Sequence, residues 1–211
     1  MKIGIFPGSF NPVHVGHLAI ANYLAEYEDF DQIWFLITPQ NPLKKKDDLL
    51  DQNFRLELVE KSIKGYDKFQ ISMIEWDLPQ PSYTINTLQK LRVTYPRDTF
   101  ELIIGSDQWA TFHRWKDYQT IIKNFKIAIY PRRGSDKFYI NHPNVRLCNG
   151  APKIEISSTF IRKSIIEGKN VRFYMPLDTF DRVVKADFFK PEEKEEEITD
   201  IKIDIDSLTL E

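Results

Sequence analysis

The sequence predicts an α/β fold, a doubly wound, mostly parallel, Rossmann-like sheet with helices on both faces. Two observations predict it. Short apolar runs that end at proline or glycine alternate, along nearly the whole chain, with segments whose apolar residues recur at helical spacing. The 211 residues, 42% of them hydrophobic, suffice for one large domain with a true core. Ligands of such sheets bind beyond the carboxyl ends of strands, so we expect chemistry after strands one, two, four and five.

The predicted strands are short and apolar and are bounded by turn residues. They cover residues 2–6, 33–38, 69–73, 100–105, 125–131 and 145–148. The first of them is expected to stop at Pro7-Gly8, and Ile156 is expected to close one more short strand.

The predicted helices have apolar residues three and four apart. They cover residues 15–27, 52–64, 85–95, 115–123, 159–167 and 177–185. Polar residues before three of them are candidate N-caps: Asp51, then Ser82 or Thr84, then Ser157 or Ser158. Pro176 is typical of the start of the last helix.

Charge divides the chain into a predicted domain, residues 1–188, and an acidic tail, residues 189–211. Residues 187–211 carry ten acidic and three basic side chains, whereas residues 1–186 carry 26 basic and 21 acidic ones. The period-two isoleucines Ile201, Ile203 and Ile205 leave three alternatives for the tail: a flexible segment, an added edge strand, or a contact with another chain.

Several classes of protein are disfavoured by composition. No apolar run reaches the roughly 18 residues of a membrane span, and the N-terminal segment lacks the pattern of a signal peptide. Cys148, the single cysteine, excludes an internal disulfide framework. The body is too weakly basic, without a dense Lys/Arg stripe, to indicate nucleic acid. We therefore expect a cytoplasmic protein with no nucleic-acid or membrane partner, and a homo-oligomer stays open.

The segment after the first strand has the features of a phosphate-binding loop that opens a helix. Gly8 allows close approach of the backbone to a ligand, and Ser9 and the loop amides can donate to phosphate oxygens. Gly16 falls in the first helical turn, where unpaired amides and the helix dipole favour an anion. His14 and His17 are three residues apart, so both rings lie on one face and can stabilise charge on a polyphosphate.

Three other interpretations of this loop compete with a phosphate site. Two histidines at this spacing also occur as structural residues. A zinc pair would need a third ligand, and none stands nearby at a recognisable spacing. The glycine pattern of dinucleotide dehydrogenases is absent. A phosphate-binding site in this loop remains the favoured interpretation.

Two separated motifs resemble the signature of the HxGH nucleotidyltransferase superfamily. Its first loop reads G-[ST]-F-[DN]-P-x-[HT]-x-G-H, which Gly8 to His17 match, with Asn11 in place of the commoner Asp. Its second motif, ISSTxIR, is matched by Ile156 to Arg162. The resemblance implies a nucleotidyltransferase fold and an enzyme that binds ATP.

The middle of the chain is similar to the nicotinate-nucleotide adenylyltransferases. The matching segments are Pro81-Ser82-Tyr83-Thr84 with Thr87-Leu88, Ile103 to Asp107 with Phe112 and Trp115, Asn41-Pro42-Leu43-Lys44, and Tyr130 to Gly134. Leu43 departs from the His or Pro that is usual there. The resemblance covers about residues 1–188 and leaves out the tail.

The resemblance implies a role for each matching residue. His14, His17, Lys44 and Arg162 are the predicted catalytic residues. The predicted ATP site comprises Gly8, Ser9, Phe10, His14, His17, Gly105, Asp107, Ile156, Ser157, Ser158 and Arg162. The predicted nicotinate mononucleotide site comprises Lys44, Ser82, Tyr83, Thr84, Trp115, Arg132 and Arg133. Mg²⁺ is expected to arrive with ATP, held mostly by substrate and water, without a protein metal site.

The reaction implied is transfer of AMP from ATP to nicotinate mononucleotide, which yields deamido-NAD and pyrophosphate. A phosphate is already a competent nucleophile, so positioning and charge stabilisation suffice. The rivals are a pantetheine-phosphate or nicotinamide-nucleotide adenylyltransferase, a non-catalytic nucleotide sensor and a zinc-binding protein. The PSYT segment and Trp115 argue against the first of these.

Overall fold

The computed structural model describes residues 1–39, 49–132, 142–186 and 189. Its strands, each built mainly from apolar residues, form one six-stranded sheet in the order β3-β2-β1-β4-β5-β6 with parallel pairing throughout. They are β1 (Lys2–Gly8), β2 (Gln32–Ile37), β3 (Phe69–Ser72), β4 (Thr99–Gly105), β5 (Lys126–Tyr130) and β6 (Val145–Leu147). This is the predicted doubly wound arrangement. The order in which successive strands are added to the sheet reverses between β1 and β4, which is the switch point of the fold.

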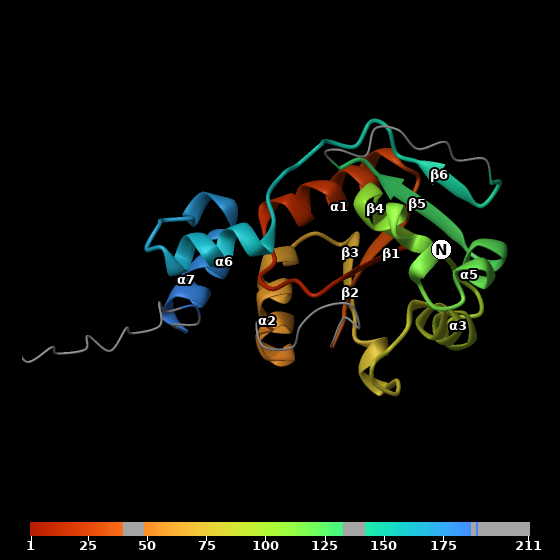
Figure 1. Cartoon of the computed structure of the whole chain (residues 1–211), viewed down its shortest axis with the longest axis horizontal. Helices are drawn as coiled ribbons and strands as arrows, with labels where there is room; N and C mark the ends of the chain where they lie inside the picture. Colours follow the sequence, from red (N-terminus) through yellow and green to blue (C-terminus); the bar gives the residue numbers. More distant parts are fainter. Residues whose placement is uncertain (40–48, 133–141, 187–188, 190–211) are drawn as a thin grey trace, which may run out of the picture.

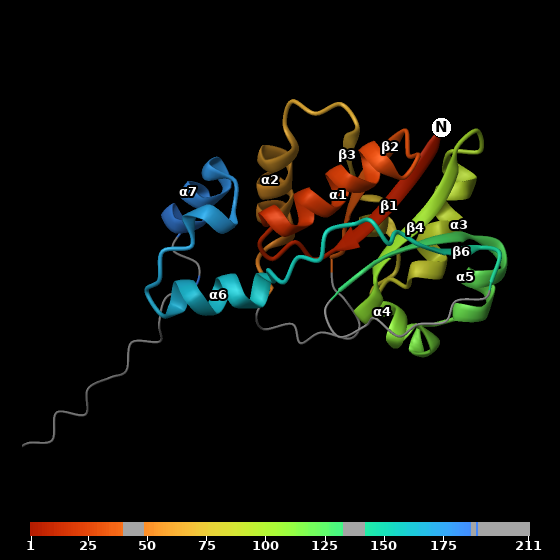
Figure 2. The same cartoon turned by 90° about the horizontal axis from the view of Figure 1, so that it is seen from above.

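The α-helices are α1 (Val15–Tyr27), α2 (Gln52–Ile63), α3 (Thr84–Thr94), α4 (Ser106–Ala110), α5 (Tyr118–Asn124), α6 (Ser158–Ile166) and α7 (Leu177–Lys185). Among the described residues, the 3₁₀ turn η1 (Ile74–Asp77) lies between β3 and α3, η2 (Phe112–Arg114) between α4 and α5, and η3 (Arg172–Tyr174) between α6 and α7. Helices α1 and α2 cover one face of the sheet and α3 and α5 the other, while α6 and α7 lie beyond α1 and α2 (Figures 1 and 2).

The core follows from the alternation of side chains along the strands. In β1, Ile3 and Ile5 belong to the apolar cluster beneath α3 and α5, whereas Phe6 belongs to the cluster beneath α1 and α2. Both clusters are buried, which is why the central strands read as continuous apolar runs.

Most predicted boundaries agree with the structure within one or two residues, and a few differ. β1 continues through Pro7 and Gly8, because the Gly8 carbonyl accepts from the amide of Thr38 at 3.1 Å. Ile156 closes no strand in the described part of the chain. The single helix predicted from Trp115 to Lys123 begins only at Tyr118. Asp117, with φ of 52°, stands in the left-handed region and interrupts helical geometry there.

The N-caps of α2, α3 and α6 agree with the predictions to different extents. The Asp51 carboxylate accepts from the amides of Asn53 and Phe54, so this prediction is confirmed. Of the two candidate serines, Ser157 caps α6 and accepts from the amide of Phe160 at 3.1 Å. Neither Ser82 nor Thr84 caps α3, whose N-cap is Tyr83 without a side-chain bond. That prediction was wrong.

Candidate active site

A cavity of about 450 Å³ opens at the carboxyl ends of the strands, where the fold predicts a ligand site. It brings together eleven of the predicted residues: Gly8, Ser9, Phe10, His17, Ser82, Tyr83, Thr84, Asp107, Trp115, Arg132 and Ser158. Five others do not line it: His14, Gly105, Ile156, Ser157 and Arg162. Lys44 and Arg133 lie outside the described residues.

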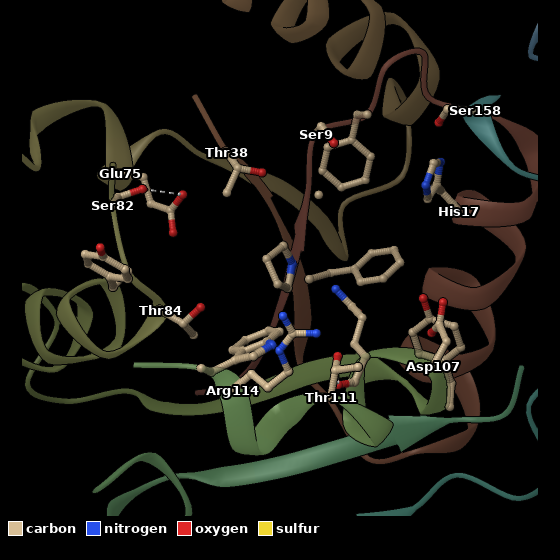
Figure 3. A pocket seen from close by; sticks show the side chains of 18 of the residues that line it. Ser9, His17, Thr38, Glu75, Ser82, Thr84, Asp107, Thr111, Arg114 and Ser158 are labelled. Atoms are coloured by element: carbon tan, nitrogen blue, oxygen red, sulfur yellow. Dashed lines mark hydrogen bonds between the residues drawn. The ribbon is translucent and has the colours of Figure 1, made fainter. Parts of the chain in front are cut away.

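The cavity has two ends built from different elements (Figure 3). His17, Ser158 and Asp107 come from the starts of α1, α6 and α4 and lie at one end. Glu75, Ser82 and Thr84, from η1 and the segment that enters α3, lie at the other end. The starts of four helices, α1, α3, α4 and α6, surround this cavity. They favour an anionic ligand because their first amides have no carbonyl partner within the helix.

The first loop is held by contacts with helix α6. Ser158 donates its hydroxyl to the carbonyl of Pro12 at 2.9 Å, and Arg162 donates from Nη1 to the carbonyl of Asn11 at the same distance. The side-chain oxygen of Asn11 accepts from the amide of Leu50 at 3.1 Å. The uncharged side chain of Asn11 therefore helps to fix the conformation of the loop by this hydrogen bond. The two sequence motifs meet in space, as their resemblance implied.

Gly8 and Phe10 shape the loop. A Cβ atom on Gly8 would lie 2.8 Å from the Phe10 ring, so packing against Phe10 already requires glycine. Phe10 is 2% exposed and has φ of 43°, an unfavourable conformation for a bulky residue. The surrounding bonds must hold this conformation in place.

The two histidines are stacked, but they have different environments. Their ring centroids are 3.7 Å apart, and the backbone amide of His14 donates to Nδ1 of His17 at 3.3 Å. A neutral His17 therefore carries its proton on Nε2, which can donate to a ligand in the cavity. His14 is 3% exposed, and burial, aided by the charge of Arg132, lowers its pKa to about 4. At neutral pH His14 is an uncharged ring that supports His17.

The start of α3 forms the other end of the cavity. The buried carboxylate of Glu75 accepts from the hydroxyl of Thr87 at 2.7 Å and from that of Ser82 at 3.3 Å. Burial raises the pKa of Glu75, and the two hydroxyl donors oppose that shift. The Trp115 ring packs on Phe112 with centroids 5.1 Å apart and also faces the cavity. Glu75 thus fixes the segment that leads to the first amides of α3.

Asp107 and Arg132 lie next to each other in the wall of the cavity. Asp107, the half-exposed second residue of α4, lies 3.7 Å from Nε of Arg132. The Arg132 amide donates to the Ser106 hydroxyl at 2.7 Å, which fixes the backbone after β5. Tyr130, buried at the end of β5, has its pKa raised to about 12 by burial and stays protonated.

Sequence reasoning missed several residues that line the cavity: Phe6, Pro7, Thr38, Glu75, Gln108, Thr111, Arg114, Lys116 and Tyr130. Thr38 directly follows β2, Tyr130 ends β5 and Glu75 follows β3, so position at a strand end was the available signal. The segment after the third strand had not been included. Arg114 and Lys116 flank Trp115 and carried no signal of their own.

The described residues contain no group of three or more His, Cys, Asp or Glu side chains placed to hold a metal ion. They also contain no helix long and apolar enough to cross a membrane.

Comparison with known proteins assigns the family. The family model described as cytidylyltransferase-like matches residues 5–164. A probable nicotinate-nucleotide adenylyltransferase from Azobacteroides pseudotrichonymphae genomovar. CFP2 is 62% identical, over 90% of this chain and 100% of that protein. A probable nicotinate-nucleotide adenylyltransferase from Bacteroides fragilis (strain YCH46) is 47% identical, over 87% of this chain and 92% of that protein.

The fold is similar to a solved structure described as Plasmodium falciparum nicotinic acid mononucleotide adenylyltransferase complexed with NaAD. The TM-score is 0.76 at 20% sequence identity, with 89% of this chain and 97% of that chain covered. This likeness supports the fold, and the closer sequence relatives carry the family. The chain belongs to the nicotinate-nucleotide adenylyltransferases, nucleotidyltransferases of the cytidylyltransferase-like family.

Proposed function

We propose that the chain transfers AMP from ATP to nicotinate mononucleotide, forming deamido-NAD and pyrophosphate in NAD biosynthesis. The names of relatives up to 62% identical support this reaction. The observation that carries it is the two-ended cavity, with His17 and Ser158 at one end and the start of α3 at the other. Its volume of about 450 Å³ suits the reacting parts of two nucleotides.

ATP occupies the end formed by the first loop. The amides of Gly8, Ser9 and Phe10 and Nε2 of His17 donate to its phosphates, and Asp107, next to Gly105, accepts from its ribose. Ser158 contacts the outer phosphates. Ser157 caps α6, and Arg162 donates to the carbonyl of Asn11, so both position that helix against the first loop, after Ile156. His14 acts by stacking on the His17 ring and by the hydrogen bond that its backbone amide donates to Nδ1 of His17.

Nicotinate mononucleotide occupies the end formed by α3 and Trp115. The ring lies on the face of Trp115, and the first amides of α3, at Tyr83 and Thr84 beside Ser82, receive its carboxylate. Cationic side chains hold the mononucleotide phosphate: Arg132 on the described wall, with Lys44 and Arg133 in the adjoining segments.

The chemical step is an in-line displacement. An oxygen of the mononucleotide phosphate attacks the α-phosphorus of ATP, a new P–O bond forms, and the bond to the pyrophosphate oxygen breaks. Neither a general base nor a covalent enzyme intermediate is required, because the attacking phosphate is already anionic. Positioning and stabilisation of charge on the phosphates therefore provide the catalysis.

Mg²⁺ enters with ATP in this proposal. The described residues line the cavity with few carboxylates, and Asp107 already faces Arg132 at 3.7 Å, which fits an ion held by phosphate oxygens and water. The ion would neutralise part of the phosphate charge.

We also propose a cytoplasmic location, since ATP is an intracellular substrate.

Pyrophosphate release from ATP tests the function. We expect rapid release with nicotinate mononucleotide, slower release with nicotinamide mononucleotide, and none with phosphopantetheine. Equal or faster turnover of the nicotinamide form would reassign the acceptor. Release with none of the three would refute the enzyme assignment.

A further inference from the structure

Arg55 is a fully buried arginine in the first turns of α2. Its Nε donates to the carbonyl of Leu50 at 3.0 Å. Its Nη1 donates to the carbonyls of Ser9 and Thr38, both at 2.8 Å, and its Nη2 donates to that of Pro39 at 3.1 Å. No carboxylate of the described residues lies within ion-pair distance of it. Burial of a guanidinium is costly, so four backbone bonds in place of an ion pair call for an explanation.

The four carbonyls belong to segments that meet at the proposed reaction centre. Ser9 and Thr38 line the cavity at the ends of β1 and β2. Pro39 and Leu50 stand at either side of residues 40–48, the segment that contains Lys44. A guanidinium is planar and rigid, so bonding to all four fixes these backbones relative to one another.

The loop that Arg55 holds is also strained. Phe10, directly after Ser9, has φ of 43°, and such conformations persist only where neighbouring bonds enforce them. Helix α6 holds the later part of the loop through the carbonyls of Asn11 and Pro12. Arg55 holds the earlier part through the carbonyl of Ser9.

We propose that Arg55 is a positioning residue for AMP transfer, which fixes the ATP-phosphate loop relative to the end of β2 and the start of α2. This inference rests on the proposed function. Arg55 does not line the cavity, so it acts through the carbonyls of Ser9, Thr38, Pro39 and Leu50. Its loss would misalign the two phosphates while each substrate still binds.

In-line transfer is sensitive to such misalignment, since a displacement of about 1 Å can cost roughly 100-fold in rate. We expect Arg55→Gln to lower kcat about 100-fold and Arg55→Lys, which keeps the charge and part of the bonding, about 10-fold. Calorimetry with nicotinate mononucleotide alone, and with an α,β-methylene ATP analogue alone, should give dissociation constants within about fivefold of wild type.

Arg146→Gln is the matched control. Arg146 is partly buried, whereas Arg55 is fully buried, and it is bonded to Glu28 and Glu101; none of these three residues lines the cavity. The Arg146→Gln substitution should lower the melting temperature, while kcat per folded molecule stays within about twofold of wild type. If Arg55→Gln does not fold, Arg55→Lys carries the test.

The outcomes separate the two proposals. An unchanged kcat in a folded Arg55 variant, or a loss of kcat equalled by Arg146→Gln, would overturn the positioning role and leave the proposed function intact. A large loss of kcat with intact binding of both ligands supports it. A wild-type protein that forms no deamido-NAD would instead refute the proposed function.

Discussion

At the scale of single residues, burial gives neighbouring side chains different tasks. His14 and His17 share a motif and stack on each other, yet only His17 faces the cavity. The desolvated His14 stays neutral, so charge stabilisation falls to His17 and the loop amides. The sequence placed both rings on one helix face, but the depth of burial that separates them depends on packing by distant segments.

The low pKa of His14 makes stability depend on pH. Its folded value of about 4 lies below the ordinary 6.5, so between these values the unfolded chain binds the proton first. The free energy of unfolding should therefore fall as pH drops from 6.5 to 4, by about 3 kcal/mol from this residue. Urea denaturation of wild type and His14→Gln across this range measures it. Identical pH slopes in the two proteins would contradict the assignment.

Glu75 supports the acceptor end of the cavity through Ser82 and Thr87. Glu75→Ala leaves both buried hydroxyls without their acceptor, so we expect a loss of about 2–4 kcal/mol in stability. The KM for nicotinate mononucleotide should rise more than that for ATP, because the start of α3 is displaced. Glu75→Gln, which keeps the volume and one acceptor oxygen, should show smaller changes. A larger rise in the KM for ATP would count against this role.

At the scale of elements, helix α6 joins the two motifs, and its two serines have different bonds. Ser157 caps the helix, whereas Ser158 bonds to the first loop and lines the cavity. The sequence predicted a cap at one of them, but the choice depends on where the chain leaves the loop before α6. The structure shows this difference, and kinetics can test it.

Alanine variants of the two serines separate cap from site. Ser157→Ala should lower the free energy of unfolding by about 1 kcal/mol through the lost cap. Ser158→Ala should lower stability less, and should lower kcat/KM for ATP by about 10-fold. Thermal unfolding and steady-state kinetics give both values. A larger loss of stability in Ser158→Ala together with a larger loss of kcat/KM in Ser157→Ala would contradict this assignment of the cap to Ser157 and the ligand contact to Ser158.

The elements also show where prediction from sequence stops. Strands and long helices were predictable because apolar periodicity is local, and the motif residues were predictable because they sit at strand-to-helix junctions. The break at Asp117, the buried Glu75 and the buried Arg55 were not predicted. Their conformation or partners are set by residues distant in sequence, and no periodic pattern records a polar side chain directed into the core.

At the scale of the whole molecule, the family model matches residues 5–164, which include every residue that lines the cavity. The 62% identical relative is covered completely by an alignment over 90% of this chain. About a tenth of the chain therefore has no counterpart there, and the division at residue 188 predicts that this part is the acidic tail. The isoleucine pattern of the tail lies outside the described residues.

Removal of residues 191–211 tests that division. Because the cavity and the elements around it end by Lys185, we expect kcat/KM to stay within about twofold of the full chain. Light scattering on both proteins reports whether the tail contributes to an oligomer. A truncated protein that fails to fold, or that loses about 10-fold in kcat/KM, would make the tail part of the catalytic domain.

The central claim is that this cavity transfers AMP to nicotinate mononucleotide with His17 acting on the phosphates. Single-turnover formation of deamido-NAD, followed by mass spectrometry in wild type and His17→Ala, tests it most directly. We predict formation by wild type and a rate at least about 100-fold lower in the variant, with the fold retained. Equal rates in the two proteins, or no deamido-NAD from wild type, would contradict the claim.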